Sequence, residues 1–535
     1  MVAALCLMLS AALTRAQQTD ATAAWRPQIH FYAPPNWIND PNGPILINGQ
    51  YNLFFQLNPL GDQWGHMSWG HAVSTDLIHW KRLPTAIAEE NGVSIFSGST
   101  VNDANNTSGL CGAAGAQIPD CIIAIYTGAS PNLQTQNLAY SRDGGVTWTK
   151  YSGNPVIDLG LSEFRDPKVF WHAPTQSWVM VVALSAEHKV RIYRSPNLRQ
   201  WTLASEFGPA GAVAGVWECP DLFELPVFDP TGKHDGSRWL LSVNVGAGSP
   251  AGGGGDQYFI GRFDGSHFVE DHPGSGPHWA DWGKDFYAST SLVNGPAGPD
   301  GIADRLWLGW MASPQYAGKL PALPGRGEMT VVRRLFLREP PPYPPPTPTE
   351  EPLLLVQQPV LPGPVYKRYA AVWGAPPFLT IAQANAQLVK DKLPGRAYRL
   401  RFDLDPGEAS QAGVRICAGG QPAEETLIGI DTGSSRIFVD RTRSGRTDWS
   451  PLFPVRVSAP LKHPQAESIP IEIVVDSNSV EVFAENGETV LTDLIYPSAA
   501  SQGISFYSTV TPPGSAPAHV RNIKIVSFDE HATQP

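Results

Sequence analysis

The sequence predicts an all-β protein in which a five-bladed β-propeller is followed by a β-sandwich domain. Short apolar and aromatic runs, such as residues 178–183 and 239–243, alternate with turn clusters, and this alternation is typical of many short strands. The 51 Gly and 51 Pro residues supply the turns. A chain of 535 residues exceeds what one hydrophobic core usually supports, so two domains are expected.

A weak internal repeat predicts the blades of the propeller. Four similar turn segments each end on an aromatic residue, at Trp80, Trp148, Trp201 and Phe268. These aromatic residues lie 53 to 68 residues apart, and one four-stranded blade with its loops occupies an interval of that length. About five such units fit between residues 25 and 337, which form the predicted catalytic domain.

A proline-rich stretch predicts the boundary between the two domains. Residues 340–348 contain seven prolines, and proline offers no N–H group to a sheet interior. Residues 338–365 should therefore form a stiff, extended linker. Beyond it, runs at 398–404 and 469–476 alternate apolar and polar residues, as strands buried on one face do. Residues 366–535 are therefore predicted to form a β-sandwich.

The N-terminus is predicted to be the signal peptide of a secreted protein. Residues 1–16 contain an apolar run followed by small residues at a cleavage position. In a secreted protein, Cys111 and Cys121 could close a disulfide. Asn105 and Asn106 begin two overlapping glycosylation sequences.

The charge balance argues against polyanionic partners. The 38 Lys and Arg residues against 49 Asp and Glu residues give a net charge of −11, and no basic stripe is present, so nucleic-acid binding is not expected. No second apolar stretch is long enough to span a membrane. No Cys and His set has metal-ligand spacing, so neither a metal nor a cofactor is predicted. A neutral ligand meets no such electrostatic barrier.

Three acidic residues stand in unusual local contexts. These contexts are Trp37-Ile38-Asn39-Asp40-Pro41-Asn42-Gly43, Phe164-Arg165-Asp166-Pro167 and Trp217-Glu218-Cys219-Pro220-Asp221. The acids are 126 and 52 residues apart, which suits about two blades and one blade of the predicted propeller. Because the innermost strands of a propeller meet at one axis, these three side chains are expected to share a pocket.

The residue types in these contexts indicate cleavage of a glycosidic bond. That reaction uses one carboxylate to attack or to activate water, and another to protonate the departing oxygen. Asparagine neighbours would hold Asp40 in a turn, and Arg165 would keep Asp166 ionised. Glu218 lies between a Trp and a Cys, an apolar setting that suits a general acid. Each context alone also fits an ordinary turn or ion pair, but the combination favours a catalytic site.

The motifs resemble those of glycoside hydrolase family 32. The resemblance is carried, in family order, by residues 37–43, Phe96-Ser97-Gly98-Ser99, Arg165-Asp166-Pro167 and Trp217-Glu218-Cys219-Pro220. This family contains the invertases, exo-inulinases, levanases and related fructosyltransferases. The resemblance extends from about residue 25 to the C-terminus, and it implies a five-bladed propeller followed by a sandwich. It also implies an enzyme that releases fructose from sucrose or fructans.

The same resemblance implies roles for individual residues. Asp40 would attack the anomeric carbon of fructose, and Glu218 would protonate the leaving oxygen and then activate water, so that configuration is retained. Asp166 would bind fructose hydroxyls and stabilise the cationic transition state. The residues implied to bind substrate are Asn39, Gln56, Trp64, Ser99, Arg165, Asp281, Lys284 and Trp310.

Three other functions remain open from the sequence. A fructosyltransferase would use the same three acids but pass fructose to an acceptor sugar instead of water. A sister five-bladed family acts on arabinans or xylans with two Asp and one Glu, but it lacks the motif of residues 37–43. A fructan-binding protein would have lost catalysis, which the presence of all three acids disfavours. The preference among sucrose, inulin and levan is also open, as is the oligomeric state.

Overall fold

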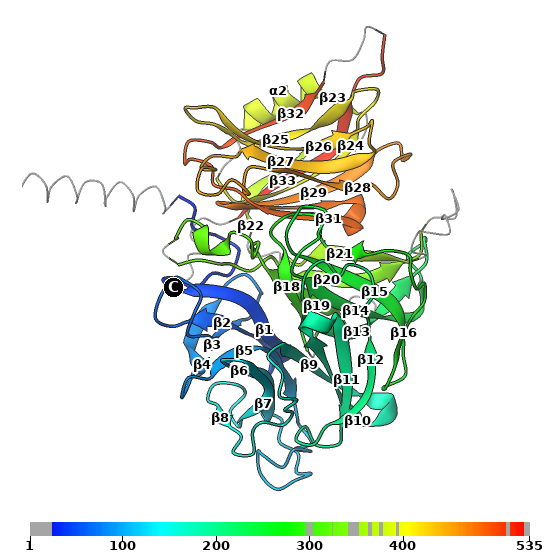
Figure 1. Cartoon of the computed structure of the whole chain (residues 1–535). Coiled ribbons are helices and arrows are strands. Elements are labelled where there is room, and N and C mark those ends of the chain that lie inside the picture. Colours follow the sequence, from blue (N-terminus) through cyan, green and yellow to red (C-terminus); the bar gives the residue numbers. More distant parts are fainter. Residues whose placement is uncertain are drawn as a thin grey trace, which may run out of the picture.

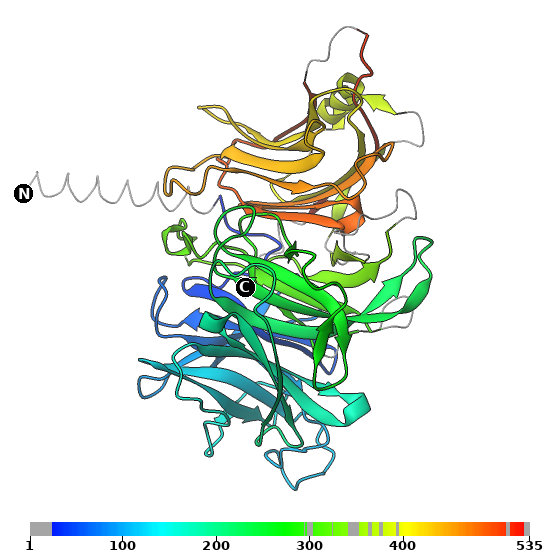
Figure 2. The ribbon, with the colours of Figure 1, turned by 45° about the vertical axis from the view of Figure 1, so that its right-hand side comes forward.

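The protein folds into two β domains that are stacked on one another (Figure 1). The computed structural model describes residues 24–293, 295–296, 303–323, 325–340, 353–361, 366–373, 378–391, 395–509 and 514–528. Figure 2 shows the same two layers from a second direction, with the N-terminal domain in blue to green and the C-terminal domain in yellow to red. The described residues hold one α-helix, α2 (Ile381–Asp391). No helix among them is long and apolar enough to cross a membrane.

Within the described residues, the N-terminal domain consists of five four-stranded units. Three units are separate sheets, formed by β1 (Trp37–Ile47), β2 (Gln50–Asn58), β3 (Ser68–Ser74) and β4 (Lys81–Ile87); β5 (Ser94–Asn102), β6 (Ile122–Ser130), β7 (Leu133–Ser141) and β8 (Thr149–Lys150); and β9 (Phe164–His172), β10 (Ser177–Leu184), β11 (Lys189–Ser195) and β12 (Thr202–Phe207). The other two share one sheet, formed by β13 (Trp217–Phe228), β14 (His234–Val245), β15 (Gly255–Phe263), β16 (Phe268–Glu270) and β17 (His278–Trp279), then β18 (Tyr287–Ser291), β19 (Arg305–Trp310), β20 (Arg333–Arg338) and β21 (Leu354–Pro359).

The first strand of each unit lies on the central axis. Strands β1, β5, β9, β13 and β18 contact one another in a closed ring. Two units merge into one sheet because β13 pairs in parallel with β20 at their ends, through Val227 and Phe228. This arrangement is the predicted five-bladed propeller.

The sequence repeat marks the same turn, between the third and fourth strands, in four blades. The indole N–H of Trp80 donates to the carbonyl oxygen three residues earlier at 3.1 Å, and Trp148 and Trp201 do the same at 2.8 and 2.9 Å. In each turn, one side-chain oxygen also accepts hydrogen bonds from two backbone N–H groups. The four accepting residues are Asp76, Asp143, Asn197 and Asp264. The recurring residue types are therefore those that close an Asx turn.

The segment predicted as a linker differs from the prediction in its second half. Residues 354–359 form β21, which pairs antiparallel with β20 and completes the fifth blade. Leu354, Leu355 and Val356 are buried there, so this apolar run forms a strand despite the prolines that precede it. Residues 341–352 and 362–365 of the predicted linker lie outside the described residues, as does the predicted signal peptide.

The C-terminal domain consists of two antiparallel sheets packed face to face. One sheet contains β22 (Tyr366–Trp373), β33 (His519–Phe528), β24 (Tyr398–Asp405), β29 (Ile469–Asp476), β30 (Ser479–Ala484), β31 (Thr489–Leu494) and, beside β33, β23 (Leu379–Thr380). The other contains β28 (Arg456–Pro460), β27 (Arg436–Arg443), β26 (Glu424–Asp431), β25 (Gln411–Gly419) and β32 (Gly503–Ser508). Leu400 and Ile473 of the first sheet meet Val414 and Ile428 of the second in one fully buried core. The predicted β-sandwich is therefore confirmed.

The loop after β5 contains the predicted disulfide between Cys111 and Cys121. The two glycosylation sequences in this loop are not equivalent. Asn105 is exposed, whereas Asn106 is fully buried and its amide bonds to the backbone of Ala113 and Cys111. In the folded protein, a glycan would therefore fit on Asn105 and not on Asn106.

A buried ionic network joins the two domains. Arg333, on β20, lies 3.0 Å from Asp281 and 2.6 Å from Glu481, which belongs to β30 of the sandwich. His30 lies between Glu481 and Asp476 at 2.9 and 2.8 Å. Burial lowers the pKa of His30, but the hydrogen bonds and charges of Asp476 and Glu481 outweigh burial and raise it to about 10. The histidine is therefore cationic at neutral pH and neutralises part of the buried acidic charge.

The residues that precede β1 lie against the sandwich. The indole N–H of Trp25 donates to the carbonyl oxygen of Pro497 at 2.6 Å. The backbone N–H groups of residues 28–30 all donate to the carboxylate of Asp476, at 2.9 to 3.3 Å. The first described residues are thus held by the β-sandwich domain.

Replacing Arg333 by methionine should lower the free energy of unfolding by about 3–5 kcal/mol, because Asp281 would remain as a buried carboxylate without its cation and Glu481 would keep only the cation of His30. Thermal unfolding followed by tryptophan fluorescence measures this loss. Arg262→Met is the control, since the Arg262 side chain is 75 % exposed and its ion pair lies on the surface, where such pairs contribute about 0–1 kcal/mol. Equal unfolding midpoints for the two variants would contradict the prediction.

Candidate active site

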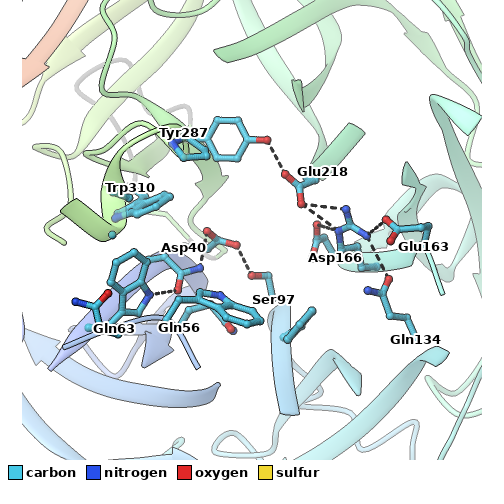
Figure 3. Close-up of a pocket in the computed structure, with 18 residues that line it drawn as sticks. Asp40, Gln56, Gln63, Ser97, Gln134, Glu163, Asp166, Glu218, Tyr287 and Trp310 are labelled. Atoms are coloured by element: carbon cyan, nitrogen blue, oxygen red, sulfur yellow. Dashed lines mark hydrogen bonds and ion pairs between the residues drawn. The ribbon is translucent and has the colours of Figure 1, made fainter. Parts of the chain in front are cut away.

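A cavity of about 610 Å³ opens at the end of the propeller axis. Side chains from all five innermost strands reach it, and loops on its rim complete the wall (Figure 3). The lining residues are Trp37, Asn39, Asp40, Gln56, Gln63, Trp64, Phe96, Ser97, Gln134, Glu163, Arg165, Asp166, Glu218, Tyr287, Trp310, Pro314, Ala317 and Gly318. The three predicted acids are all among them, so segments far apart in the sequence meet here as expected.

Every innermost strand is bulged at the level of the cavity. The pairing register shifts between residues 38 and 41, 95 and 98, 165 and 168, 218 and 221, and 287 and 290. Asp166, Cys219 and Ala288 have φ values of 66°, 45° and 53° within these bulges, a region that L-residues rarely adopt. A bulge changes the direction of a side chain relative to a regular strand, and here it turns polar side chains toward the axis.

The carboxylate of Asp40 is fixed by two hydrogen bonds. The hydroxyl of Ser97 donates to Oδ2 at 2.6 Å, and the amide of Asn39 donates to Oδ1 at 3.0 Å. Asn39 is itself oriented by the indole N–H of Trp37, at 2.8 Å. Burial raises the pKa of Asp40, the two donors oppose that rise, and the nearby charge of Glu218 adds to it. The ionised carboxylate therefore depends on its two donors.

Asp166 lies beside Asp40 in a second hydrogen-bonded position. Its Oδ2 accepts the backbone N–H of Cys219 at 2.9 Å, and Arg165 lies 3.9 Å away. Burial raises the pKa of Asp166 to about 7, with Arg165 opposing and the charges of Glu218 and Asp40 adding to the rise. The sequence-based expectation that Arg165 keeps Asp166 ionised is therefore wrong, because burial and the other acids outweigh the guanidinium.

Glu218 lies opposite Asp40, between a guanidinium and a phenol (Figure 3). Arg165 donates to Oε1 at 3.1 Å, and the hydroxyl of Tyr287 donates to Oε2 at 2.6 Å. The apolar setting predicted from the flanking Trp217 is wrong, because that indole is buried away from the cavity and donates to a backbone carbonyl. Because the strand is bulged here, Trp217 and Glu218 do not share one environment. The polar partners of Glu218, Arg165 and Tyr287, come from other blades.

The thiol of Cys219 lies between the two aspartates. Its sulfur is 3.7 Å from Oδ2 of Asp40 and 3.7 Å from Oδ2 of Asp166. Burial, followed by the charges of the surrounding acids, raises the pKa of the Cys219 thiol well above its ordinary value. The thiol therefore stays neutral and adds no negative charge between the two carboxyl groups.

Arg165 is held from its far side by two further polar residues. Its NH1 group donates to Glu163 at 2.5 Å and to Gln134 at 3.3 Å. These contacts leave Nε and NH2 directed at Glu218. Arg165 is thus fixed in place before any ligand enters.

Five of the residues predicted to bind substrate line the cavity: Asn39, Gln56, Trp64, Arg165 and Trp310. Trp64 is 60 % exposed at the rim, which leaves its ring free to stack on a sugar. Neither Nε2 of Gln56 nor Nε1 of Trp310 has a hydrogen-bond partner among the described residues. Buried donors of this kind are normally paired, so both are suited to bind ligand hydroxyls.

The other three residues predicted to bind substrate, Ser99, Asp281 and Lys284, lie outside the cavity. The Ser99 hydroxyl bonds to the backbone of β9. Asp281 is buried in the interdomain network beside Arg333. The ammonium group of Lys284 donates to two carbonyl oxygens of the loop 246–255. The geometry supports a structural role for each of them, because every one of these polar groups already has protein partners.

Sequence reasoning did not select five polar lining residues, which are Gln63, Ser97, Gln134, Glu163 and Tyr287. Ser97 lies in the Phe96–Ser99 motif, but regular strand alternation gives no reason to prefer it to Ser99. Tyr287 lies three residues after Lys284, and its role depends on a contact with Glu218 of another blade. Among the described residues, no group of three His, Cys, Asp or Glu side chains could hold a metal ion.

Comparison with protein-family models gives two matches that together cover most of the chain. Residues 30–342 match the model of the glycosyl hydrolases family 32 N-terminal domain, and residues 378–527 match that of the family 32 C-terminal domain. Among curated proteins, a levanase from Bacillus subtilis is 42 % identical over 513 residues, covering 94 % of this chain and 72 % of the levanase. An extracellular exo-inulinase from Aspergillus niger is 38 % identical over 510 residues, covering 89 % of this chain and 90 % of that protein.

Solved structures of the same kind resemble the whole fold. The exo-inulinase from Aspergillus awamori superimposes with a TM-score of 0.81 at 34 % identity, covering 94 % of this chain and 98 % of that one. The fructofuranosidase from Schwanniomyces occidentalis, complexed with fructose, gives a TM-score of 0.82 at 30 % identity, covering 95 % and 99 %. The similarity therefore includes both the propeller and the sandwich.

Proposed function

The chain belongs to glycosyl hydrolase family 32, and on that basis we propose that it releases terminal β-D-fructofuranosyl residues from sucrose and from fructans such as inulin and levan. The protein is a glycoside hydrolase. The observation that carries the proposal is the meeting of Asp40, Asp166 and Glu218, from three separate blades, in one cavity. The unpaired polar groups of Gln56 and Trp310 in that cavity suit a ligand rich in hydroxyls.

In the first step, Asp40 attacks the anomeric carbon of the terminal fructosyl unit. The bond from that carbon to the leaving oxygen breaks, and Glu218 transfers its proton to this oxygen. The hydrogen bonds from Ser97 and Asn39 favour the ionised carboxylate that attack requires. The product is a fructosyl ester of Asp40, together with the released sugar or shortened fructan.

In the second step, water resolves this ester. Glu218, now ionised, removes a proton from water, which attacks the anomeric carbon and frees Asp40. Two displacements give fructose with retained configuration. Tyr287 and Arg165 hold the two oxygens of Glu218, so the carboxyl group keeps one position through both steps.

Asp166 is proposed to bind fructose hydroxyls beside the reacting carbon. Its Oδ2 is held by the backbone of Cys219, within the same acidic cluster as Asp40. With its pKa raised to about 7, it can accept or donate a hydrogen bond near neutral pH. Its negative charge, when present, stabilises the cationic transition state.

We also propose that the enzyme acts outside the cell. Its relatives from Aspergillus niger and Aspergillus awamori are named extracellular exo-inulinases. The Cys111–Cys121 disulfide suits an oxidising compartment. Detection of the protein in culture medium, with residues 1–16 absent by N-terminal sequencing, tests this proposal.

Fructose release from sucrose, inulin and levan tests the proposed function. The purified protein is incubated with each substrate, and products are separated by chromatography, with heat-inactivated protein as the blank. Free fructose from sucrose and from at least one polymer is the expected result. Abundant trisaccharides at high sucrose would favour transfer to sugar over hydrolysis. No fructose from any of the three would overturn the proposal.

Replacing Ser97 by alanine should shift the acidic limb of the kcat/KM profile to higher pH. The Ser97 hydroxyl favours the ionised form of Asp40, so its loss raises the pKa of Asp40 further above its usual value. The nucleophile is then protonated at pH values where the wild-type carboxyl is ionised. Initial rates across the acidic pH range measure the shift. Ser99→Ala is the control, and an identical shift in both variants would contradict the assignment.

A further inference from the structure

One wall of the cavity is in direct contact with the sandwich domain. The segment 314–318 lines the cavity through three of its residues, but Tyr316 within it is buried, with 2 % of its surface exposed. The ring of Tyr316 packs against Trp449 and Phe453 of the sandwich, with centroid distances of 5.3 and 6.1 Å. The segment therefore has one side on the cavity and the other on the second domain.

A single buried guanidinium fastens this wall to the sandwich. Arg441, on β27, donates to the carboxylate of Asp285 at 2.5 Å and to the phenol oxygen of Tyr316 at 2.8 Å. Tyr316 in turn donates its hydroxyl proton to Asp285. The carbonyl oxygens of Phe453 and Leu494 accept the remaining bonds at 2.9 and 3.0 Å. The side chains of Arg441 and Asp285 are both fully buried.

Asp285 also connects this contact to the catalytic acid. It precedes Tyr287 by two residues, and the hydroxyl of Tyr287 donates to Glu218 at 2.6 Å. The backbone N–H of Leu494 donates to Asp285 at 2.9 Å, so the residues just before β18 are bound to β31. Tyr287 and Trp310 belong to one apolar cluster with sandwich residues such as Leu494. Packed side chains therefore run without interruption from the sandwich to the cavity.

We propose that Arg441 is a positioning residue for the active site, which acts through Asp285 and Tyr316 to fix the cavity wall and the tyrosine that orients Glu218. The inference rests on the proposed hydrolysis of fructosides and gives the sandwich a part in substrate binding. Arginine suits this task because its planar fork bonds several acceptors in fixed directions. Arg441 itself, being fully buried, contacts no substrate.

Tyr316→Phe is the decisive variant, because it removes one hydroxyl and leaves the Arg441–Asp285 pair in place. Loss of this tether frees the segment 314–318, and the KM for sucrose is expected to rise about fivefold with kcat changed less than about twofold. A purely structural role would lower the thermal midpoint or the active fraction without moving KM. Initial-rate kinetics on active-site-titrated enzyme measure the two constants separately.

Tyr398→Phe is the matched control. Tyr398 is buried in the sandwich core, and its hydroxyl has no hydrogen-bond partner among the described residues. Its removal should leave KM and kcat unchanged. Activity of the wild type tests the proposed function, whereas the KM ratio between Tyr316→Phe and wild type tests this inference. An unchanged KM in folded Tyr316→Phe, or an equal rise in Tyr398→Phe, would overturn it.

Arg441→Lys acts on both connections at once. A lysine keeps the charge but cannot bond Asp285, Tyr316 and two carbonyl groups in the same plane. Its kcat/KM is expected to fall about tenfold more on sucrose than on 4-nitrophenyl β-D-fructofuranoside, whose leaving group needs little protonation. Equal losses on both substrates would overturn the connection to Glu218. If this variant does not fold, the result for Tyr316→Phe decides.

Discussion

Asp40→Asn should lower kcat for sucrose hydrolysis by at least about 10⁴-fold, a loss typical of removing a catalytic nucleophile, while the protein remains as stable as the wild type. The neutral amide cannot form the covalent intermediate. It can, however, keep both local contacts, because the Ser97 hydroxyl can accept from an amide as well as donate to a carboxylate. Burial and the nearby charge of Glu218 raise the pKa of Asp40, so removing the charge of Asp40 relieves an unfavourable state of the folded protein.

The measurement combines fructose release with thermal unfolding. The matched control is Asp256→Asn, since Asp256 is also buried, also accepts from a serine hydroxyl, and has its pKa raised to about 7, chiefly by burial. It does not line the cavity, and its replacement should leave kcat within about twofold of wild type. Residual kcat above about 1 % in Asp40→Asn, after the sample is checked for wild-type contamination, would exclude Asp40 as the nucleophile.

Glu218→Gln is the second substitution expected to cause a large loss of hydrolysis rate. Proton transfer by a positioned acid contributes about 10²–10⁴-fold, so hydrolysis of sucrose should slow by that factor. The loss on 4-nitrophenyl β-D-fructofuranoside should be much smaller in the first step, because nitrophenolate leaves without a proton. Formation of the fructosyl-enzyme would then outpace its hydrolysis, and a burst of nitrophenol would precede the steady state.

Stopped-flow absorbance detects this burst, and sucrose assays give the companion rate. Glu224→Gln is the control on the same strand, because Glu224 is exposed on β13 and bonds Ser237 rather than a cavity residue. Equal losses on the two substrates, without a burst, would show that Glu218 is not the proton donor.

The propeller could be predicted from the sequence because the repeated turns share residue types that make the same hydrogen bonds, as well as a regular spacing. Trp80, Trp148 and Trp201 each close the same turn by one indole hydrogen bond, so the pattern survives where overall similarity between blades is weak. Strand β21 was missed because prolines dominate the stretch before it, although its own residues 354–356 are apolar and buried. The proline content of residues 338–365 as a whole predicted a linker, although the short apolar run within it forms β21.

The three acids were recognisable because each lies just before or inside a bulge marked by proline. Pro41, Pro167 and Pro220 stand within strands, where proline is tolerated mainly at edges and bulges. The sequence could not predict which side chains point into the cavity. Ser97 and Ser99 are two residues apart, yet the register shift between residues 95 and 98 separates their environments. Only the first contacts Asp40.

Contacts between blades or domains were equally hidden from the sequence. Asp281 was expected to bind substrate from the family resemblance, but its partner Arg333 lies 52 residues away and its other partner Thr492 lies 211 residues away. The apolar setting expected for Glu218 failed for the same reason, since Arg165 and Tyr287 come from different strands. The local sequence predicts local geometry. The charges around a side chain of the propeller depend instead on residues from other blades, which meet it only in the folded protein.

The attachment of the first described residues to the sandwich has a consequence for biosynthesis. Trp25 and the backbone at residues 28–30 contact positions that are 446 to 472 residues further along the chain. While the polypeptide is still emerging from the ribosome, the blades can form. The residues that precede β1, the strand that carries Asp40, still lack their binding partners in the sandwich. Loop closure over that many residues is slow, so these contacts are expected to form only after the sandwich strands that receive them have folded. A nascent chain that stops before Asp476 would therefore lack the carboxylate that binds the backbone of residues 28–30.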